Sequence, residues 1–181
     1  LFETGFDDPG EFPVGEEERQ NYRFENSRFI IFSEGEHRSI QPVTGQALEN
    51  FAVEFVINMR DYSPDGHCFI MIDNIHSGET DKRNLTAGLH ASGGVWADYY
   101  DYNQKGREIA SIQVETISGD KVIRFILVGD QAAVFLDGAL VSTARMPGGG
   151  AVFANFALGV NMGVTCEFDD FKLWDLSNLT A

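Results

Sequence analysis

Long apolar runs, positive charge and cysteine are all scarce in this chain. Its longest apolar runs are of the Phe69-Ile70-Met71-Ile72 kind, the length of one strand, so we expect no membrane-spanning segment. Only 13 Lys and Arg side chains accompany 28 Asp and Glu, and the formal net charge is −15. Such a charge repels the phosphates of nucleic acids and the anionic surface of a bilayer. We therefore expect neither nucleic acid nor a membrane as a partner.

The chain has only two cysteines, Cys68 and Cys166. Neither lies in a CxxC motif or in a Cys/His pattern that would hold a metal, and each lies in a segment typical of a strand. This favours two buried free thiols, with a disulfide as the alternative. The four histidines are spread along the chain without the spacing of zinc ligands.

Helical periodicity is missing as well, and short apolar segments alternate with turns instead. Between Phe51 and Arg60 alternate side chains are apolar, which predicts a strand with one face on the core. Three apolar runs follow one another from Lys121 to Met146, separated by Gly129-Asp130 and Asp137-Gly138. Asp-Gly is a strong hairpin signal, because both central residues of a type I′ turn need a positive φ. We therefore predict a β-meander there.

The remaining segments predict more strands. Leu85 to Asn103 predicts a hairpin and Ile109 to Ile117 a further strand, whereas Gln41 to Gly45 predicts a turn. In the last strand, Val164 to Leu176, the apolar positions change parity at Asp169-Asp170, which indicates a β-bulge. Short strands along all 181 residues predict one all-β domain, an antiparallel β-sandwich spanning residues 1–181.

The order of several motifs resembles that of a known superfamily over almost the whole chain. The motifs are an N-terminal FxxxFDD, the strand NFAVEFVINMR, the segment GHCFIMID, a hairpin ending in FLDGALV and the C-terminal CEFDDFKLWDL. This order resembles the concanavalin A-like lectin/glucanase superfamily, in particular its laminin G-like and carbohydrate-binding-module branches. The resemblance implies a jelly roll of one convex and one concave sheet, with the terminal strands side by side. It also implies glycan binding on the concave face or rim and, in many members, a calcium ion.

Catalytic motifs are missing. Retaining glucanases of this fold carry Glu-x-Asp-x-x-Glu on one strand, since alternate positions place nucleophile and acid on the same face, and this chain has no such triplet. It also lacks a nucleophile elbow, an HExxH motif and a P-loop. We therefore expect a non-catalytic protein, with a hydrolase whose carboxylates come from separate strands as an alternative.

The hairpin from Leu85 to Asn103 has the richest set of potential binding side chains. Alternation predicts that its aromatic and polar residues share the face opposite the core. Such a face suits a sugar, whose C–H groups stack on aromatic rings while its hydroxyls take hydrogen bonds. An arginine would project onto the same face from a neighbouring strand. The predicted ligand site consists of Arg60, His90, Trp96, Asp98, Tyr100 and Tyr102. Alternatively, these aromatic residues pack beneath loops as ordinary sandwich residues.

Two acidic pairs form a candidate metal site. Asp7 and Asp8 follow the first strand, while Asp169 and Asp170 lie in the last. If the terminal strands are neighbours, these four carboxylates lie close together and suit a structural calcium ion, which prefers several oxygen ligands. In the alternative interpretation, Asp7-Asp8 caps a turn and Asp169-Asp170 stabilises a bulge.

Together, these features predict a non-catalytic, lectin-like carbohydrate-binding module whose partner is a glycan or polysaccharide. Because the chain begins at Leu1 rather than at a Met, we expect a processed form or a piece of a longer protein. We expect an extracellular, cell-surface or periplasmic location. The alternatives are a protein-recognition or adhesion module of the same fold and, further off, a glycoside hydrolase with non-standard carboxylates.

Overall fold

A computed structural model of the chain describes residues 1–6, 15–17, 20–35, 38–74, 83–101, 105–113, 117–146 and 152–179. These residues form strands and their connections, and among them no helix could cross a membrane. The strands are β1 (Phe2–Thr4), β2 (Gly15–Glu17), β3 (Gln20–Glu25), β4 (Arg28–Ser33), β5 (Arg38–Thr44), β6 (Phe51–Tyr62), β7 (His67–Asn74), β8 (Arg83–His90), β9 (Gly94–Asp101), β10 (Lys105–Gln113), β11 (Lys121–Val128), β12 (Gln131–Leu136), β13 (Ala139–Arg145), β14 (Phe153–Asn161) and β15 (Val164–Asp175).

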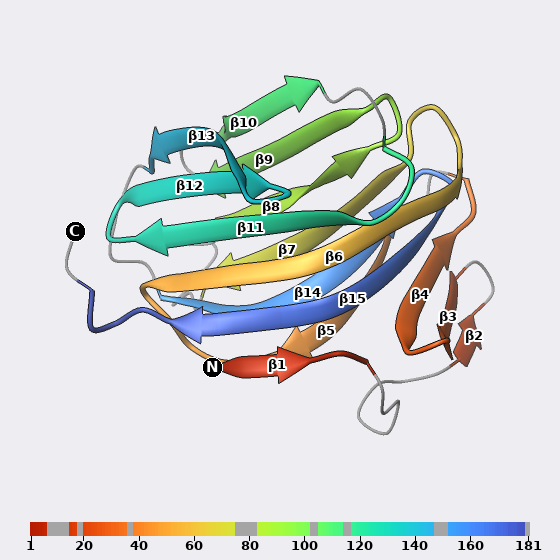
Figure 1. Ribbon diagram of the computed structural model, residues 1–181, viewed down its shortest axis with the longest axis horizontal. Helices are drawn as coiled ribbons and strands as arrows, with labels where there is room; N and C mark the ends of the chain where they lie inside the picture. Colours follow the sequence, from red (N-terminus) through yellow and green to blue (C-terminus); the bar gives the residue numbers. More distant parts are fainter. Residues whose placement is uncertain are drawn as a thin grey trace.

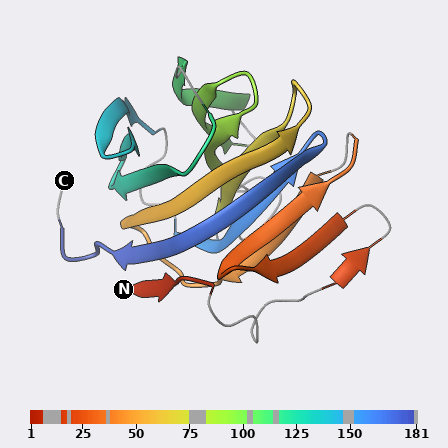
Figure 2. The same cartoon turned by 45° about the vertical axis from the view of Figure 1, so that its right-hand side comes forward.

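The strands form two antiparallel sheets that pack face to face (Figure 1). The larger sheet has nine described strands in the order β13-β12-β11-β6-β15-β4-β3-β2, with β1 paired to β15. The smaller has six, in the order β10-β9-β8-β7-β14-β5. The first and last strands lie side by side, with Phe2 opposite Leu173 and Thr4 opposite Phe171, as Figure 2 also shows. The antiparallel sandwich and the neighbouring terminal strands are therefore confirmed.

Alternating apolar side chains from both sheets fill the space between them. On β6 every second residue from Phe51 to Met59 is buried, as predicted, and Ala52 between them is buried as well. The ring of Phe51 meets that of Phe156 on β14 edge-to-face, with centroids 5.2 Å apart across the sheets. Burying one such side chain contributes about 1.5–3 kcal/mol, so this apolar layer holds the sheets together.

The meander and the bulge both form as predicted. Strands β11, β12 and β13 pair in sequence, and Asp137 and Gly138 turn between the last two with φ of 48° and 79°. In β15 the register against β6 shifts between Asp169 and Lys172, and Asp170 has φ 49°. Phe168 and Phe171 are separated by an odd number of positions, so in a regular strand they would face opposite sides of the sheet. The register shift turns both side chains into the core.

Two expected boundaries are wrong. Gln41 to Gly45 does not form a turn, because β5 runs to Thr44 and pairs with β14, where Gln41 lies opposite Leu158. Pro42 fits this strand because β5 is an edge strand of the smaller sheet, where one backbone N–H is not needed for a ladder. Strand β10 begins at Lys105, four residues before the expected start at Ile109.

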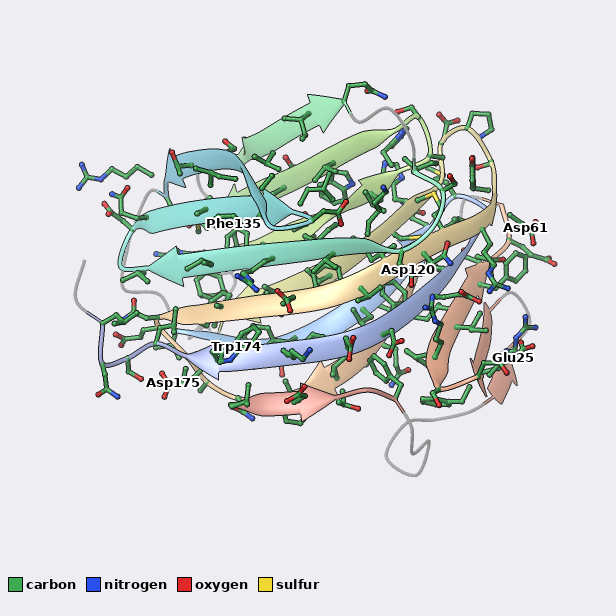
Figure 3. All side chains as sticks on the ribbon, in the orientation of Figure 1. Glu25, Asp61, Asp120, Phe135, Trp174 and Asp175 are labelled. Carbon is green, nitrogen blue, oxygen red and sulfur yellow. A yellow bond between two sulfur atoms is a disulfide. The ribbon has the colours of Figure 1, made fainter. Side chains whose placement is uncertain are left out.

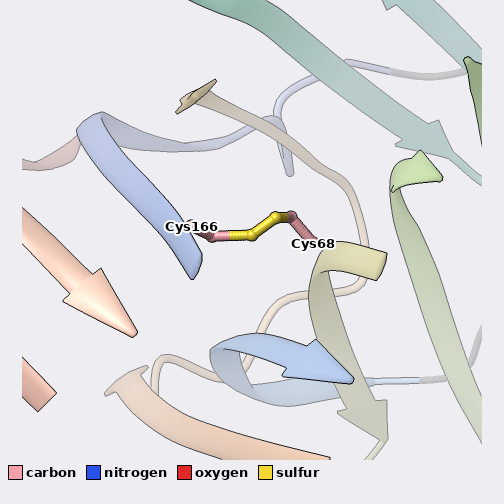
Figure 4. Close-up of a disulfide and its surroundings, with 2 residues drawn as sticks. All are labelled: Cys68 and Cys166. Atoms are coloured by element: carbon pink, nitrogen blue, oxygen red, sulfur yellow. A yellow bond between two sulfur atoms is a disulfide. The ribbon is translucent and has the colours of Figure 1, made fainter. Parts of the chain in front are cut away.

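A disulfide joins Cys68 on β7 to Cys166 on β15 and so links the two sheets (Figure 4). The Cα atoms are 6.0 Å apart, and both residues are fully buried. The expected pair of free thiols is therefore wrong. Both cysteines occupy inward positions on strands that face each other across the core, a proximity that local sequence patterns do not reveal.

Candidate functional site

An open cleft of about 1100 Å³ crosses the outer face of the smaller sheet. It lies mainly over β7, β8, β9 and β10, which are neighbours in that sheet (Figure 1). On β9 the core takes Val95, Ala97 and Tyr99, so the residues between them face the cleft. The lining includes His67, Phe69, Asn84, Thr86, His90, Ser92, Trp96, Asp98, Tyr100, Ser111, Gln113 and Asn161.

The floor of the cleft is aromatic and crosses three strands. Gly88 on β8 lies opposite Phe69 of β7 on one side and opposite Trp96 of β9 on the other. The Trp96 ring nevertheless reaches to within 6.2 Å of the Phe69 ring and 5.9 Å of the His67 ring, between centroids. Because β7 and β9 are not neighbours, the indole spans the gap that the missing side chain of Gly88 leaves.

Only glycine fits at position 88. A Cβ atom added to Gly88 would lie 2.0 Å from the carbonyl oxygen of Cys68 and 2.7 Å from the Cα of Phe69. Both contacts involve backbone, which has no room to move without disturbing the β7–β8 ladder. Gly88 therefore allows both the close approach of β7 and β8 and the formation of the aromatic floor above them.

A pair of histidines lies at one end of the floor. His67 and His90 are opposite each other on β7 and β8, and their rings meet edge-to-face with centroids 4.3 Å apart. The Nδ1 of His90 accepts the backbone N–H of Ser92 at 3.0 Å, which places the proton of the neutral ring on Nε2. Burial, reinforced by the nearby His90, lowers the pKa of His67. Two of the four histidines, although far apart in the sequence, thus form a contact pair.

Polar side chains extend the floor toward the other end of the cleft. Thr86 lies opposite Asp98 and Asn84 lies opposite Tyr100, which is 40% exposed. Their amide, hydroxyl and carboxylate groups include both donors and acceptors of hydrogen bonds. Among the described lining residues, Asp98 has the only carboxylate, and none is Lys or Arg.

The structure brings together four of the six residues in the predicted ligand site. His90, Trp96, Asp98 and Tyr100 all line the cleft, whereas Tyr102 lies outside the described residues. The expected position of Arg60 is wrong. It lies on β6 in the larger sheet, where its Nη2 is 2.6 Å from Oε1 of Glu167. The turn after β6 carries the chain into the other sheet, so residues close in sequence belong to opposite layers.

Sequence reasoning missed three parts of the cleft floor: His67, Phe69 and Gly88. Alternation on β7 contained a signal for the first two, because Cys68, Ile70 and Ile72 occupy the inward positions between and after them. A glycine inside a strand also indicates a close approach of backbones. The sequence does not show the register of the strands, however, and it is this register that brings the rings of Phe69 and Trp96 together across Gly88.

The described part of the predicted metal site already has cationic neighbours. Asp169 Oδ2 lies 3.7 Å from Nε of Arg28, and Asp170 Oδ1 lies 3.9 Å from Nζ of Lys172. Burial raises the pKa of Asp169, which disfavours its charged form. No three His, Cys, Asp or Glu side chains in the described ranges are grouped closely enough to hold a metal. Asp7 and Asp8 lie outside those ranges, so calcium at the terminal strands stays a prediction.

The outer face of the larger sheet carries an ionic network instead of an aromatic floor. The Glu167 carboxylate, only 3% exposed, lies 2.6 Å from Arg60 and 3.3 Å from Arg28. Arg28 also donates two hydrogen bonds of 2.7 Å to Asp120, labelled in Figure 3, and thereby lowers the pKa of that carboxyl. These charges neutralise one another, so we assign the network a structural role.

Comparisons with known proteins identify the fold. No protein-family model matches the chain, and no curated protein matches it either. Several solved structures are similar. A carbohydrate-binding module from Bacillus subtilis has a TM-score of 0.63 at 17% identity, covering 85% of this chain and 91% of the module. The catalytic domain of an endo-1,3-β-glucanase (laminarinase) from Thermotoga petrophila RKU-1 has a TM-score of 0.73 at 11% identity, covering 98% of both chains.

A third similar structure was solved with a sugar bound. The κ-carrageenase from Pseudoalteromonas carrageenovora, in complex with an oligotetrasaccharide of κ-carrageenan, has a TM-score of 0.71 at 10% identity and covers 96% of this chain and 92% of that one. At such identities the likeness defines the fold and not the activity. The chain has the concanavalin A-like lectin/glucanase fold, so the fold that the sequence resemblance implied is confirmed. Carbohydrate-binding modules and polysaccharide-degrading enzymes share this fold.

Proposed function

We propose that this protein is a non-catalytic carbohydrate-binding module that holds a polysaccharide in the cleft of the smaller sheet. The observation that carries the proposal is the aromatic floor, in which Trp96 extends over Gly88 toward Phe69. An aromatic surface ringed by polar groups suits a pyranose, whose C–H face stacks on the ring while its hydroxyls bond at the edges. Asn84, Thr86 and Asp98 supply such groups beside the floor.

The size of the cleft favours a chain of sugars over a single one. Small-molecule sites usually measure about 300–1,000 Å³ and enclose most of their ligand. This cleft, at about 1100 Å³, is larger and lies along an open sheet face. We therefore infer that several sugar units bind across the strands.

Binding without hydrolysis follows from the carboxylates of the cleft. Glycosidases use two carboxyl groups, about 5–5.5 Å apart in retaining enzymes and about 6.5–9.5 Å apart in inverting ones. Asp98 is the one carboxylate among the described lining residues. The cleft-facing positions of β8 carry Asn84, Thr86, Gly88 and His90, none of which is a carboxylic acid.

The disulfide supports a secreted or surface location. Buried structural disulfides are typical of oxidising compartments and rare in reducing ones. Cys68 and Cys166 are joined and leave no free cysteine in the chain. Polysaccharides of cell walls and matrices are encountered in the same compartments.

The two tryptophans of the chain offer a matched test. Trp96 lies in the cleft, whereas Trp174 lies on the outer face of the larger sheet, beneath the Arg124 guanidinium (Figure 3). Affinity electrophoresis against a broad panel of polysaccharides should show retardation of the wild type, and Trp96→Ala should weaken the affinity about tenfold or more. Trp174→Ala should bind as the wild type does. If no polysaccharide retards the wild type, or if Trp174→Ala alone abolishes binding, the proposal is wrong.

A further inference from the structure

The distribution of charge around the cleft indicates which class of polysaccharide it accepts. Resting on the proposed function, we infer that the cleft selects uncharged polysaccharides and excludes those bearing carboxylate or sulfate groups. This selection concerns the charge of the polysaccharide and not binding alone. It depends on where this chain places its acidic and basic side chains.

Acidic side chains lie on the cleft face of the smaller sheet. Asp98 lines the cleft beside Thr86 and next but one along β9 from Trp96. On β7, Asp73 lies opposite Asn84, four positions after Phe69. Because side chains alternate along a strand, Asp73 and Phe69 are on the same outer face of the sheet. An anionic sugar bound along the floor would lie beside Asp98, and a longer chain would extend toward Asp73 outside the lining of the cleft. Like charges brought together in this way strongly oppose association.

The basic side chains that the structure describes lie outside the lining of the cleft. Arg60, Arg28 and Arg124 all lie on the larger sheet, and each pairs with a carboxylate there. Within the smaller sheet, Arg83 on β8 lies opposite Asp101, and its Nε is 3.9 Å from Oδ2 of that carboxylate. No described lining residue therefore presents the guanidinium or ammonium that recognition of a sulfate or carboxylate requires.

Nor is His67, at the end of the floor, a good substitute for such a cation. His67 is disfavoured in its charged form by burial and by the adjacent His90. Asp65, which precedes β7, raises the pKa of His67, but this effect is smaller than the lowering by burial and by His90. At this end of the cleft, His67 thus offers a neutral imidazole, which exchanges hydrogen bonds with hydroxyl groups.

Pairs of polysaccharides with a common backbone test the inference. Hydroxyethyl-cellulose and carboxymethyl-cellulose form one pair, and laminarin and sulfated laminarin form another. At low salt we expect at least tenfold weaker binding to the anionic member of any pair whose neutral member binds. The difference should shrink in 1 M salt, where charges are screened beyond about 3 Å. Equal or tighter binding of the anionic member, or a difference that salt leaves unchanged, would overturn the inference.

A charge-removing variant locates the effect. Asp98→Asn should narrow the preference for the neutral polysaccharide by threefold or more at low salt. Asp61→Asn removes the same charge from β6 on the larger sheet and should leave the preference unchanged. If Asp61→Asn narrows it equally, net charge and not the cleft is responsible, and the inference fails. If only the anionic polysaccharides bind, the inferred selectivity is wrong but the proposed carbohydrate binding stands. If none of the polysaccharides binds, both the selectivity and the proposed function are wrong.

Discussion

Reducing the disulfide between Cys68 and Cys166 should lower the free energy of unfolding by about 4–5 kcal/mol. The bond closes a loop of 98 residues, and the loss of chain entropy in the unfolded state is worth about 4.7 kcal/mol for a loop of roughly 100 residues. Both residues are fully buried in the core, so the native packing around them changes little on reduction. For a chain of this size the effect corresponds to a fall in melting temperature of roughly 10–20 °C.

Urea unfolding followed by tryptophan fluorescence, at equilibrium with and without dithiothreitol, measures this effect. The double variant Cys68→Ala/Cys166→Ala is the control, because it has no disulfide and should not respond to the reductant. Mass spectrometry after alkylation without reduction reports the thiols directly. Two alkylated cysteines in the unreduced protein, or identical unfolding midpoints with and without reductant, would refute the reasoning.

Two further predictions concern the cleft floor. Gly88→Ala should destabilise the protein by several kcal/mol, because its Cβ would overlap the backbone of β7, whereas Gly45→Ala, where nothing lies within 4 Å of the added atom, should be nearly neutral in thermal unfolding; equal effects of both changes would contradict the packing described here. The pKa of His67 is held below its usual 6.5, so the unfolded chain takes up the proton first as the pH falls. The corresponding stability is complete above pH 6.5 and is lost as the pH falls toward the folded-state pKa. Melting temperatures at pH 7 and pH 5 should therefore differ less in His67→Gln than in the wild type, and an equal or larger difference would count against a buried neutral imidazole.

Period-two alternation made much of the fold predictable and correctly placed four of the six residues of the predicted ligand site. It assigned Trp96, Asp98 and Tyr100 to one face, and they do line one cleft. The parity change in the last strand likewise predicted the bulge at Asp169-Asp170. Such patterns are local, because they depend only on which side of a strand each residue occupies.

Apart from the start of β10, the errors concern contacts between distant segments. Alternation does not say which sheet a strand joins, so Arg60 was expected beside Trp96 although the chain crosses to the other layer after β6. Nor does it show that Cys68 and Cys166 face each other, or that β5 adds to the edge of the smaller sheet. These features follow from pairing between strands that are far apart in the sequence, and the distance along the chain does not reveal which strands pair.

A crystal structure with a bound oligosaccharide, cut from whichever polysaccharide binds most tightly, tests the central claim most directly. The account predicts a sugar ring packed against the indole of Trp96, with hydroxyl groups bonded to Asn84, Thr86 or Asp98. A sugar found on the outer face of the larger sheet beside Trp174, with the cleft of the smaller sheet empty, would contradict it.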